Sequence, residues 1–130
     1  MKKKKPKIVV LCGSSRFVDV MAVCAWLIER DENAITMGLH LLPIWYAGNI
    51  PSHLAEHEDV ANKMDERHLR KIDLASEIFV VNREHYVGES TANEVEYGRK
   101  KEIIIRWYTD DIIGFQVEKM IHAFLSKRGA

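Results

Sequence analysis

Apolar runs alternate with helical patterns four times along this chain, and this alternation constrains the fold more than any other feature. The first run, Lys7 to Cys12, is rich in β-branched residues and has no polar residue at every second position. Such a run is typical of a strand buried on both faces of a parallel sheet. The other runs expected to form strands are Ala34 to Leu42, Glu77 to Asn82 and Ile103 to Trp107.

The segments between these runs carry apolar residues at helical spacing. From Phe17 to Arg30 they recur every three or four positions, which indicates an amphipathic helix. The other helices are expected as one long exposed helix from Ser52, its N-cap, to Ala75, a short helix ending at Lys101, and a closing helix from Ile112 to Leu125. The alternation predicts an α/β fold of the Rossmann-like or flavodoxin-like kind, with four or five parallel strands in the order 2-1-3-4 and helices on both faces.

Length and composition predict one domain. The 130 residues, 47% of them hydrophobic, suffice for a single core over residues 7–130, and residues 1–6 read as a disordered basic arm. Nineteen Lys and Arg balance nineteen Asp and Glu, which argues against a nucleic-acid polymer as partner. No apolar run approaches the roughly 20 residues that cross a bilayer, so we expect a cytoplasmic protein with no membrane partner.

Two cysteines, Cys12 and Cys24, lie outside any C-x-x-C pair, which fits reduced thiols. Buried packing explains both. A nucleophilic role for Cys12 is the alternative, although sequence places no base beside it.

The stretch GESTANE, Gly88 to Glu94, joins the third expected strand to the next helix. Small residues, hydroxyls and a carboxylate at such a junction suit an anionic or sugar-bearing ligand, because helix N-termini present unpaired N–H groups. A capping box explains the same residues: Thr91 would be the N-cap, and the side chain of Glu94, three residues later, would bond back to it.

A second loop, Gly13 to Arg16, follows the first expected strand. Glycine and two serines at a strand end suit a phosphate, and Arg16 adds a fixed positive charge. The alternative is a tight turn with an N-cap serine and a solvated arginine. In a sheet of order 2-1-3-4 this loop faces the Gly88 to Glu94 stretch across one crevice beyond the carboxyl ends of the strands.

Three motifs together resemble a known family. They are the CGSSR segment from Cys12 to Arg16, the acid-then-strand segment Glu77 to Val81, and Ser90-Thr91-x-x-Glu94 followed by Gly98. They are similar to the nucleoside 2-deoxyribosyltransferase superfamily, including its deoxynucleoside 5′-monophosphate N-glycosidases. In that family a glutamate attacks the anomeric carbon of the sugar and expels the base.

The resemblance implies that Glu94 is the nucleophile and that the protein forms a dimer or a larger homo-oligomer. We expect no cofactor and no metal. The residues expected to contact the sugar or phosphate are Gly13, Ser14, Ser15, Arg16, Gly88, Ser90 and Thr91.

This chain also departs from the family pattern. Val10 occupies the position where the family often has a tyrosine that orients the nucleophile. The family's second acid falls on Leu69, which leaves His68, Asp65 and Asp73 as open candidates for the proton donor.

A second resemblance is to the phosphoribohydrolases that activate cytokinins, although this chain lacks their glycine-rich segment. Both families cut N-glycosidic bonds, so the sequence predicts N-glycosidic cleavage or transfer on a nucleoside or its 5′-monophosphate. A noncatalytic nucleotide-binding module of the same fold is the rival.

Two further features remain open. His53 and His57 have a metal-ligand spacing, but a third ligand is not evident, and a solvated helix start explains them. Trp45 and Tyr46 could stack on a base or pack against the protein.

Overall fold

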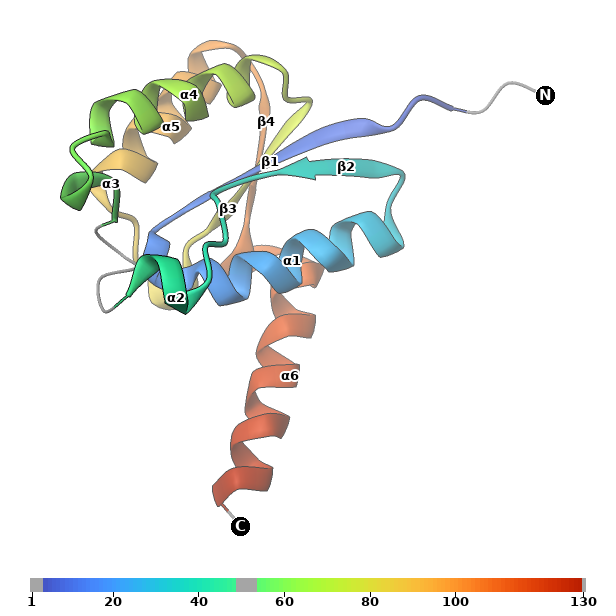
Figure 1. Cartoon of the computed structure of the whole chain (residues 1–130). Coiled ribbons are helices and arrows are strands. Elements are labelled where there is room, and N and C mark those ends of the chain that lie inside the picture. The colour runs from blue at the N-terminus through green and yellow to red at the C-terminus, as the bar shows by residue number, and fades with distance from the viewer. Residues whose placement is uncertain (1–3, 49–53, 130) are drawn as a thin grey trace.

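The sheet is entirely parallel. A computed structural model describes residues 4–48 and 54–129 (Figure 1). Its strands are β1 (Lys7–Gly13), β2 (Ala34–Met37), β3 (Glu77–Val81) and β4 (Ile104–Trp107). Across the described residues they form one sheet in the order β2-β1-β3-β4, which confirms the predicted fold class and strand order.

Helices cover both faces of this sheet. They are α1 (Val18–Asp31), α2 (Ile44–Ala47), α3 (Leu54–His57), α4 (Ala61–Asp73), α5 (Glu89–Lys100) and α6 (Ile112–Gly129), with short 3₁₀ turns at Ser15–Phe17, Arg83–His85 and Tyr108–Asp110. In Figure 1, α4 and α5 lie on one side of the strands and α1 lies on the other, where α6 begins before it extends away from the body. No helix in the described ranges is long and apolar enough to cross a membrane.

The core has two halves because successive strand residues point to opposite faces. Val9 and Leu11 of β1 pack into the cluster formed with α1 and α6, whereas Val10 and Cys12 pack into the cluster formed with α4 and α5. All four are essentially inaccessible to solvent. The unbroken apolar run in the sequence therefore reflects helical cover on both faces.

Gly98 lets α5 approach the sheet closely. A Cβ atom at this position would overlap the Ile78 side chain of β3 and would also touch Ile105 of β4. The missing side chain thus sets the depth at which α5, including Glu94 one turn earlier, lies against the strands.

The predicted long helix from Ser52 to Ala75 is wrong. The chain instead forms α3 and α4, and the turn between them places Asp59 in the left-handed region (φ 59°). Helical backbone cannot continue through that conformation. Ser52, the expected N-cap, and His53 lie outside the described residues.

Smaller differences occur at other boundaries. Strand β2 ends at Met37 rather than Leu42, and the aromatic loop that follows contains the short helix α2, which carries Trp45 and Tyr46. The closing helix α6 runs on to Gly129 instead of ending at Leu125. Within the expected basic arm, Lys4–Pro6 have no regular structure and residues 1–3 are outside the described part of the chain.

Candidate functional site

The two predicted loops leave the sheet side by side. Strands β1 and β3 are neighbours, and Gly13 at the end of β1 is in register with Val81 at the end of β3. The Gly13 to Arg16 loop and the segment that leads from β3 to Gly88 therefore leave the same carboxyl edge of the sheet, where ligands of such folds bind, and Tyr86 of that segment contacts Arg16.

The loop after β1 is a capped 3₁₀ turn. The Ser14 hydroxyl accepts a hydrogen bond from the Arg16 backbone N–H at 3.2 Å, and the Ser14 carbonyl accepts one from the Phe17 N–H. The predicted capping role of the serine is present. Gly13 and Ser15 are half-buried beside it.

Arg16 lies over an aromatic ring. Its guanidinium carbon is 3.8 Å from the centre of the Tyr86 ring, a cation–π contact. No carboxylate among the described residues forms an ion pair with Arg16, and the residue is exposed. Its fork of N–H donors is therefore available to an anion.

Tyr86 also contacts a second aromatic ring. It meets the Phe17 ring edge-on, with 6.1 Å between the ring centres, and its hydroxyl lies close to Gly88, where an added Cβ atom would be 3.5 Å from the oxygen. The two residues before it, Glu84 and His85, both have positive φ angles near 60°. Such backbone is costly for residues with side chains and is concentrated at functional sites, where the surrounding structure holds it.

Helix α5 begins within the Gly88 to Glu94 stretch, which the sequence pattern placed before the helix, and the capping box considered as the alternative is absent. Gly88 is the N-cap, with extended backbone and no side-chain cap, and Glu89 is the first helical residue. Thr91 is buried inside the first turn and Ser90 is exposed. Glu94 therefore lies in the second turn, beyond the position from which a side chain bonds to the N-cap residue. Its carboxyl group is free for other contacts.

Glu94 instead belongs to a buried cluster with His68 and Cys12. His68 Nε2 is 3.5 Å from Glu94 Oε2 and 3.4 Å from Cys12 Sγ. The three side chains come from α5, α4 and the end of β1, and their exposed fractions are 8%, 4% and 0%. One imidazole nitrogen thus lies between a carboxyl oxygen and a sulfur.

Burial keeps all three groups neutral near pH 7. It raises the pKa of Glu94 to about 8, and the negative charge of Asp65 adds to this effect. Burial lowers the pKa of His68 to about 4, with help from Lys71, and it raises the pKa of the Cys12 thiol well above its ordinary value. Between the pKa of His68, about 4, and the pKa of Glu94, about 8, the His68–Glu94 pair carries a single titratable proton and no net charge.

The structure separates the three candidates for the proton donor. His68 contacts Glu94 directly, and Asp65, one turn earlier on α4, is exposed but close enough to influence its charge. Asp73 lies at the other end of α4, where it pairs with Arg70 at 2.9 Å and Lys101 at 2.8 Å. This geometry leaves Asp73 with no contact to Glu94.

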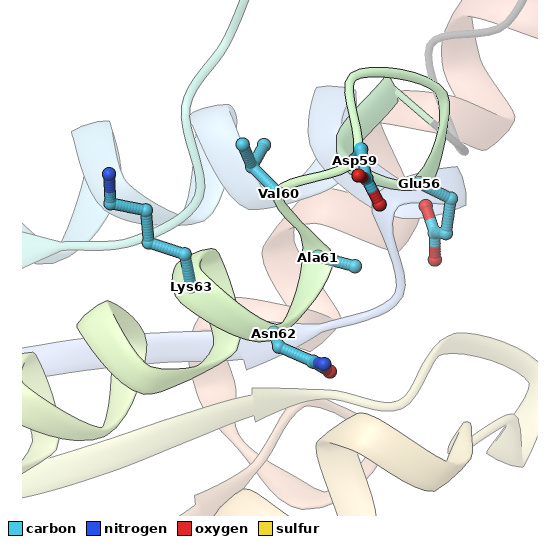
Figure 2. Close-up of a pocket in the computed structure, with 6 residues that line it drawn as sticks. All are labelled: Glu56, Asp59, Val60, Ala61, Asn62 and Lys63. Atoms are coloured by element: carbon cyan, nitrogen blue, oxygen red, sulfur yellow. The ribbon is translucent and has the colours of Figure 1, made fainter.

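An open cavity of ≈ 580 Å³ lies at the turn between α3 and α4. Figure 2 shows its side chains spread around the turn, with Lys63 and Val60 pointing away from Asn62 rather than toward a common centre. Asn62 is six residues before His68, about 9 Å along the helix at 1.5 Å per residue. We assign no chemistry to this cavity.

The cluster also contains the donors that a metal ion would need. Within the described part of the chain, Cys12, His68 and Glu94 form a group whose possible ligand atoms all lie within 4.8 Å of one another. His57, half of the predicted histidine pair, is exposed at the end of α3.

Sequence reasoning placed Cys12 in the core but not beside an imidazole. The signal that could have revealed the contact is its position as the last fully buried residue of β1, on the face that α4 covers. Comparison of the chain with protein-family models, curated proteins and solved structures gave no match.

Proposed function

We propose that this protein cleaves or transfers the N-glycosidic bond of a nucleoside or deoxynucleoside, or of its 5′-monophosphate, with Glu94 as nucleophile. The observation that carries the proposal is a buried carboxyl group in contact with a neutral imidazole at the carboxyl edge of a parallel sheet. The resemblance of the chain's motifs to those of the nucleoside 2-deoxyribosyltransferase superfamily supports the same proposal.

The contact between His68 and Glu94 supports a proton-transfer role for the histidine. In the proposed first step, the Glu94 proton moves to His68 Nε2 and the carboxylate attacks the anomeric carbon. The bond to the base breaks, its electron pair leaves with the base nitrogen, and the imidazolium returns the proton to that base. Water or a second base then opens the glycosyl ester and regenerates the carboxyl group.

Arg16 supplies the second part of the proposal. A cation without an acidic partner in the described ranges, held against Tyr86 at the same edge of the sheet, suits the phosphate of a 5′-monophosphate. The expected contacts from Gly13, Ser14, Ser15, Gly88, Ser90 and Thr91 belong to the same proposal. Their positions around this edge support it.

A noncatalytic nucleotide-binding module is the second candidate. Two observations favour it: Val10 is fully buried where the related enzymes often carry a tyrosine, and Glu94 is largely protonated at pH 7. A protonated carboxyl group can donate a hydrogen bond to a ligand but is a poor nucleophile.

The test is release of free base. Protein kept metal-free with EDTA is incubated with deoxynucleosides, ribonucleosides and their 5′-monophosphates, and released base is measured by chromatography. We expect release from at least one substrate and a loss of roughly 10³-fold or more in Glu94→Gln. Glu96→Gln is the matched control, because Glu96 is exposed on the same helix.

Each outcome has a distinct meaning. Nucleotide-dependent thermal stabilisation without base release, equal in wild type and Glu94→Gln, supports the binding module and contradicts the enzyme. Release that survives Glu94→Gln contradicts the assignment of the nucleophile. Release only from ribonucleotide monophosphates favours the phosphoribohydrolase relationship.

The proposal also covers location and assembly. Two buried free cysteines support a reducing compartment such as the cytosol. A homo-oligomer, which the family resemblance implies, is tested by light scattering of the purified protein.

A further inference from the structure

Two of the three spacings among the Cys12, His68 and Glu94 ligand atoms match those of a metal coordination shell, and the third pair, the Cys12 sulfur and a Glu94 carboxyl oxygen, lies within 4.8 Å. In tetrahedral zinc sites the Zn–S bond is about 2.3 Å and Zn–N and Zn–O bonds are about 2.0–2.2 Å, so neighbouring S and N ligands are separated by roughly 3.5 Å and N and O ligands by roughly 3.4 Å. Here Sγ is 3.4 Å from Nε2, and Nε2 is 3.5 Å from the Glu94 Oε2 atom.

The chemistry of the donors narrows the choice of metal. A thiolate sulfur and an imidazole nitrogen select zinc and similar transition metals, whereas calcium and magnesium require oxygen ligands. Three protein ligands with a fourth position left open is the pattern of reactive zinc sites, in contrast to the closed four-ligand pattern of structural ones. Glu94 has the most accessible side chain of the three, 11% against 4% for His68, so the open position lies on its side.

We propose that Cys12, His68 and Glu94 form a site that binds one zinc ion per chain. The three ligands come from β1, α4 and α5, three elements that pack together in one half of the core. The site is therefore already assembled by the fold, and binding requires only small side-chain movements.

Charge also fits a divalent ion in this position. Thiolate, neutral imidazole and carboxylate carry two negative charges, which a zinc ion neutralises. The buried assembly then has no net charge, which avoids the large cost of placing an unbalanced charge in the protein interior. Without the ion, the same cluster is neutral through its protons.

Bound zinc would take up the Glu94 carboxylate and so block glycosidic cleavage. This inhibitory consequence rests on the proposed function, whereas zinc binding does not. A chain with no glycosidase activity could still bind zinc at this site, and an active enzyme could fail to bind it.

The experiment measures metal binding without substrate. Metal-free protein is titrated with zinc chloride against a chromophoric chelator, with magnesium chloride as control. We expect one zinc per chain, no competition from magnesium, and at least about a 10-fold loss of affinity in Cys12→Ala and in Glu94→Gln. Cys24→Ala is the matched control, because Cys24 is equally buried on the opposite face of the sheet.

Cobalt provides a second measurement that does not depend on the folding of Cys12→Ala. Cobalt(II) bound to a thiolate gives a near-ultraviolet charge-transfer band. In Cys24→Ala the only remaining thiol is that of Cys12, so the band in this variant identifies the ligand. Absence of the band in Cys24→Ala, or zinc affinity that is the same in Cys12→Ala and wild type, overturns the proposal.

Discussion

Two polar clusters lie inside this small protein, and their electrostatics are opposite. The first, called here the ion network, lies around the amino ends of β1 and β3. It consists of Lys7, Glu32, Glu77, Arg106 and Asp111. Arg106 contacts three of these carboxylates at 2.9–3.1 Å, and Lys7 contacts two at 3.0 and 3.1 Å. Each acid in the network therefore has a cation.

The cluster of Cys12, His68 and Glu94 has no such balance. The pKa of Glu94 is raised. Burial also acts to raise the pKa values of Glu32 and Asp111, but the hydrogen bonds and positive charges around them, from Arg106 together with Lys7, and for Asp111 a backbone N–H, outweigh it and lower both values. The same chemical group is thus held as an anion in one region and as a neutral acid in the other. The ion network keeps its acids charged by pairing them, whereas the buried Glu94 is kept neutral at a cost in stability above the ordinary pKa of a glutamate.

The largest effect should follow from removing the centre of the ion network. Arg106→Leu leaves three carboxylates with only Lys7 between them, so we expect a loss of about 3 kcal/mol in the free energy of unfolding. Urea denaturation at pH 7 measures it. Arg70→Leu is the control, because the Arg70 side chain is 51% exposed and its ion pairs should contribute under about 1 kcal/mol. Equal losses in both variants would remove the distinction between the network and a surface pair.

Replacing the ionisable group of Glu94 should increase the free energy of unfolding, the opposite of the effect expected for Arg106→Leu. The folded pKa of about 8 exceeds the ordinary value of 4.5, so the folded state holds the proton more tightly and wild-type stability falls as the pH rises from 4.5 to 8. Glu94→Gln lacks this loss. In the presence of EDTA its stability relative to wild type should increase by about 2–3 kcal/mol between pH 4.5 and 8.5, roughly half of what about 1.4 kcal/mol per pKa unit gives over the whole shift, because solvent reaches part of the carboxyl group. A difference that does not change with pH would show that Glu94 is ionised in the folded protein.

Acid should weaken the ion network by a smaller amount. Because the folded pKa values of Glu32 and Asp111 are lowered, their contribution is complete above the unfolded values and is lost as the pH falls through the folded ones. We expect wild-type stability to drop by about 1 kcal/mol from this source between pH 5 and 3. Urea midpoints across this range in wild type and Arg106→Leu measure it, and the drop should be smaller in the variant. The same drop in both would contradict the role of Arg106.

The smallest effect concerns Asp65. Its negative charge is the second cause of the raised pKa of Glu94, after burial, so Asp65→Asn should lower that pKa slightly without removing the shift. The change is measured as a displacement of the pH range in which Glu94→Gln gains stability over the parent protein. Glu66→Gln, which removes an exposed charge from the next position on α4, serves as control. A displacement as large with Glu66→Gln would assign the effect to general surface charge.

The sheet was predictable from sequence because its evidence is local and repeated. Unbroken apolar runs such as Lys7 to Cys12 indicate strands covered on both faces, and right-handed crossovers then limit the strand order. The break in the helical segment from Ser52 to Ala75 was not predictable, because it depends on the left-handed backbone of Asp59. Aspartate adopts that conformation more often than most residues, but it is also common on exposed helix surfaces, so its presence does not identify the break.

The candidate site was predictable only in part. Strand order fixes the edge of the sheet at which each loop lies, and this places the loops after β1 and β3 at the same edge. The contact of His68 with both Glu94 and Cys12 depends on the rotation of α4 about its axis and on the depth of α5, which packing sets over the whole core. Sequence left His68 as one of three alternatives for that reason.

Gly98 limits how this cluster could be transferred to another protein. Copying Cys12, His68 and Glu94 onto a similar sheet would not reproduce their distances if the recipient helix carried a side chain four residues after the glutamate. That side chain would hold the helix away from the strands and withdraw the carboxyl group from the imidazole. A transfer of this site must therefore include the spacing Glu-x-x-x-Gly, because the glycine determines whether the carboxyl group reaches the imidazole.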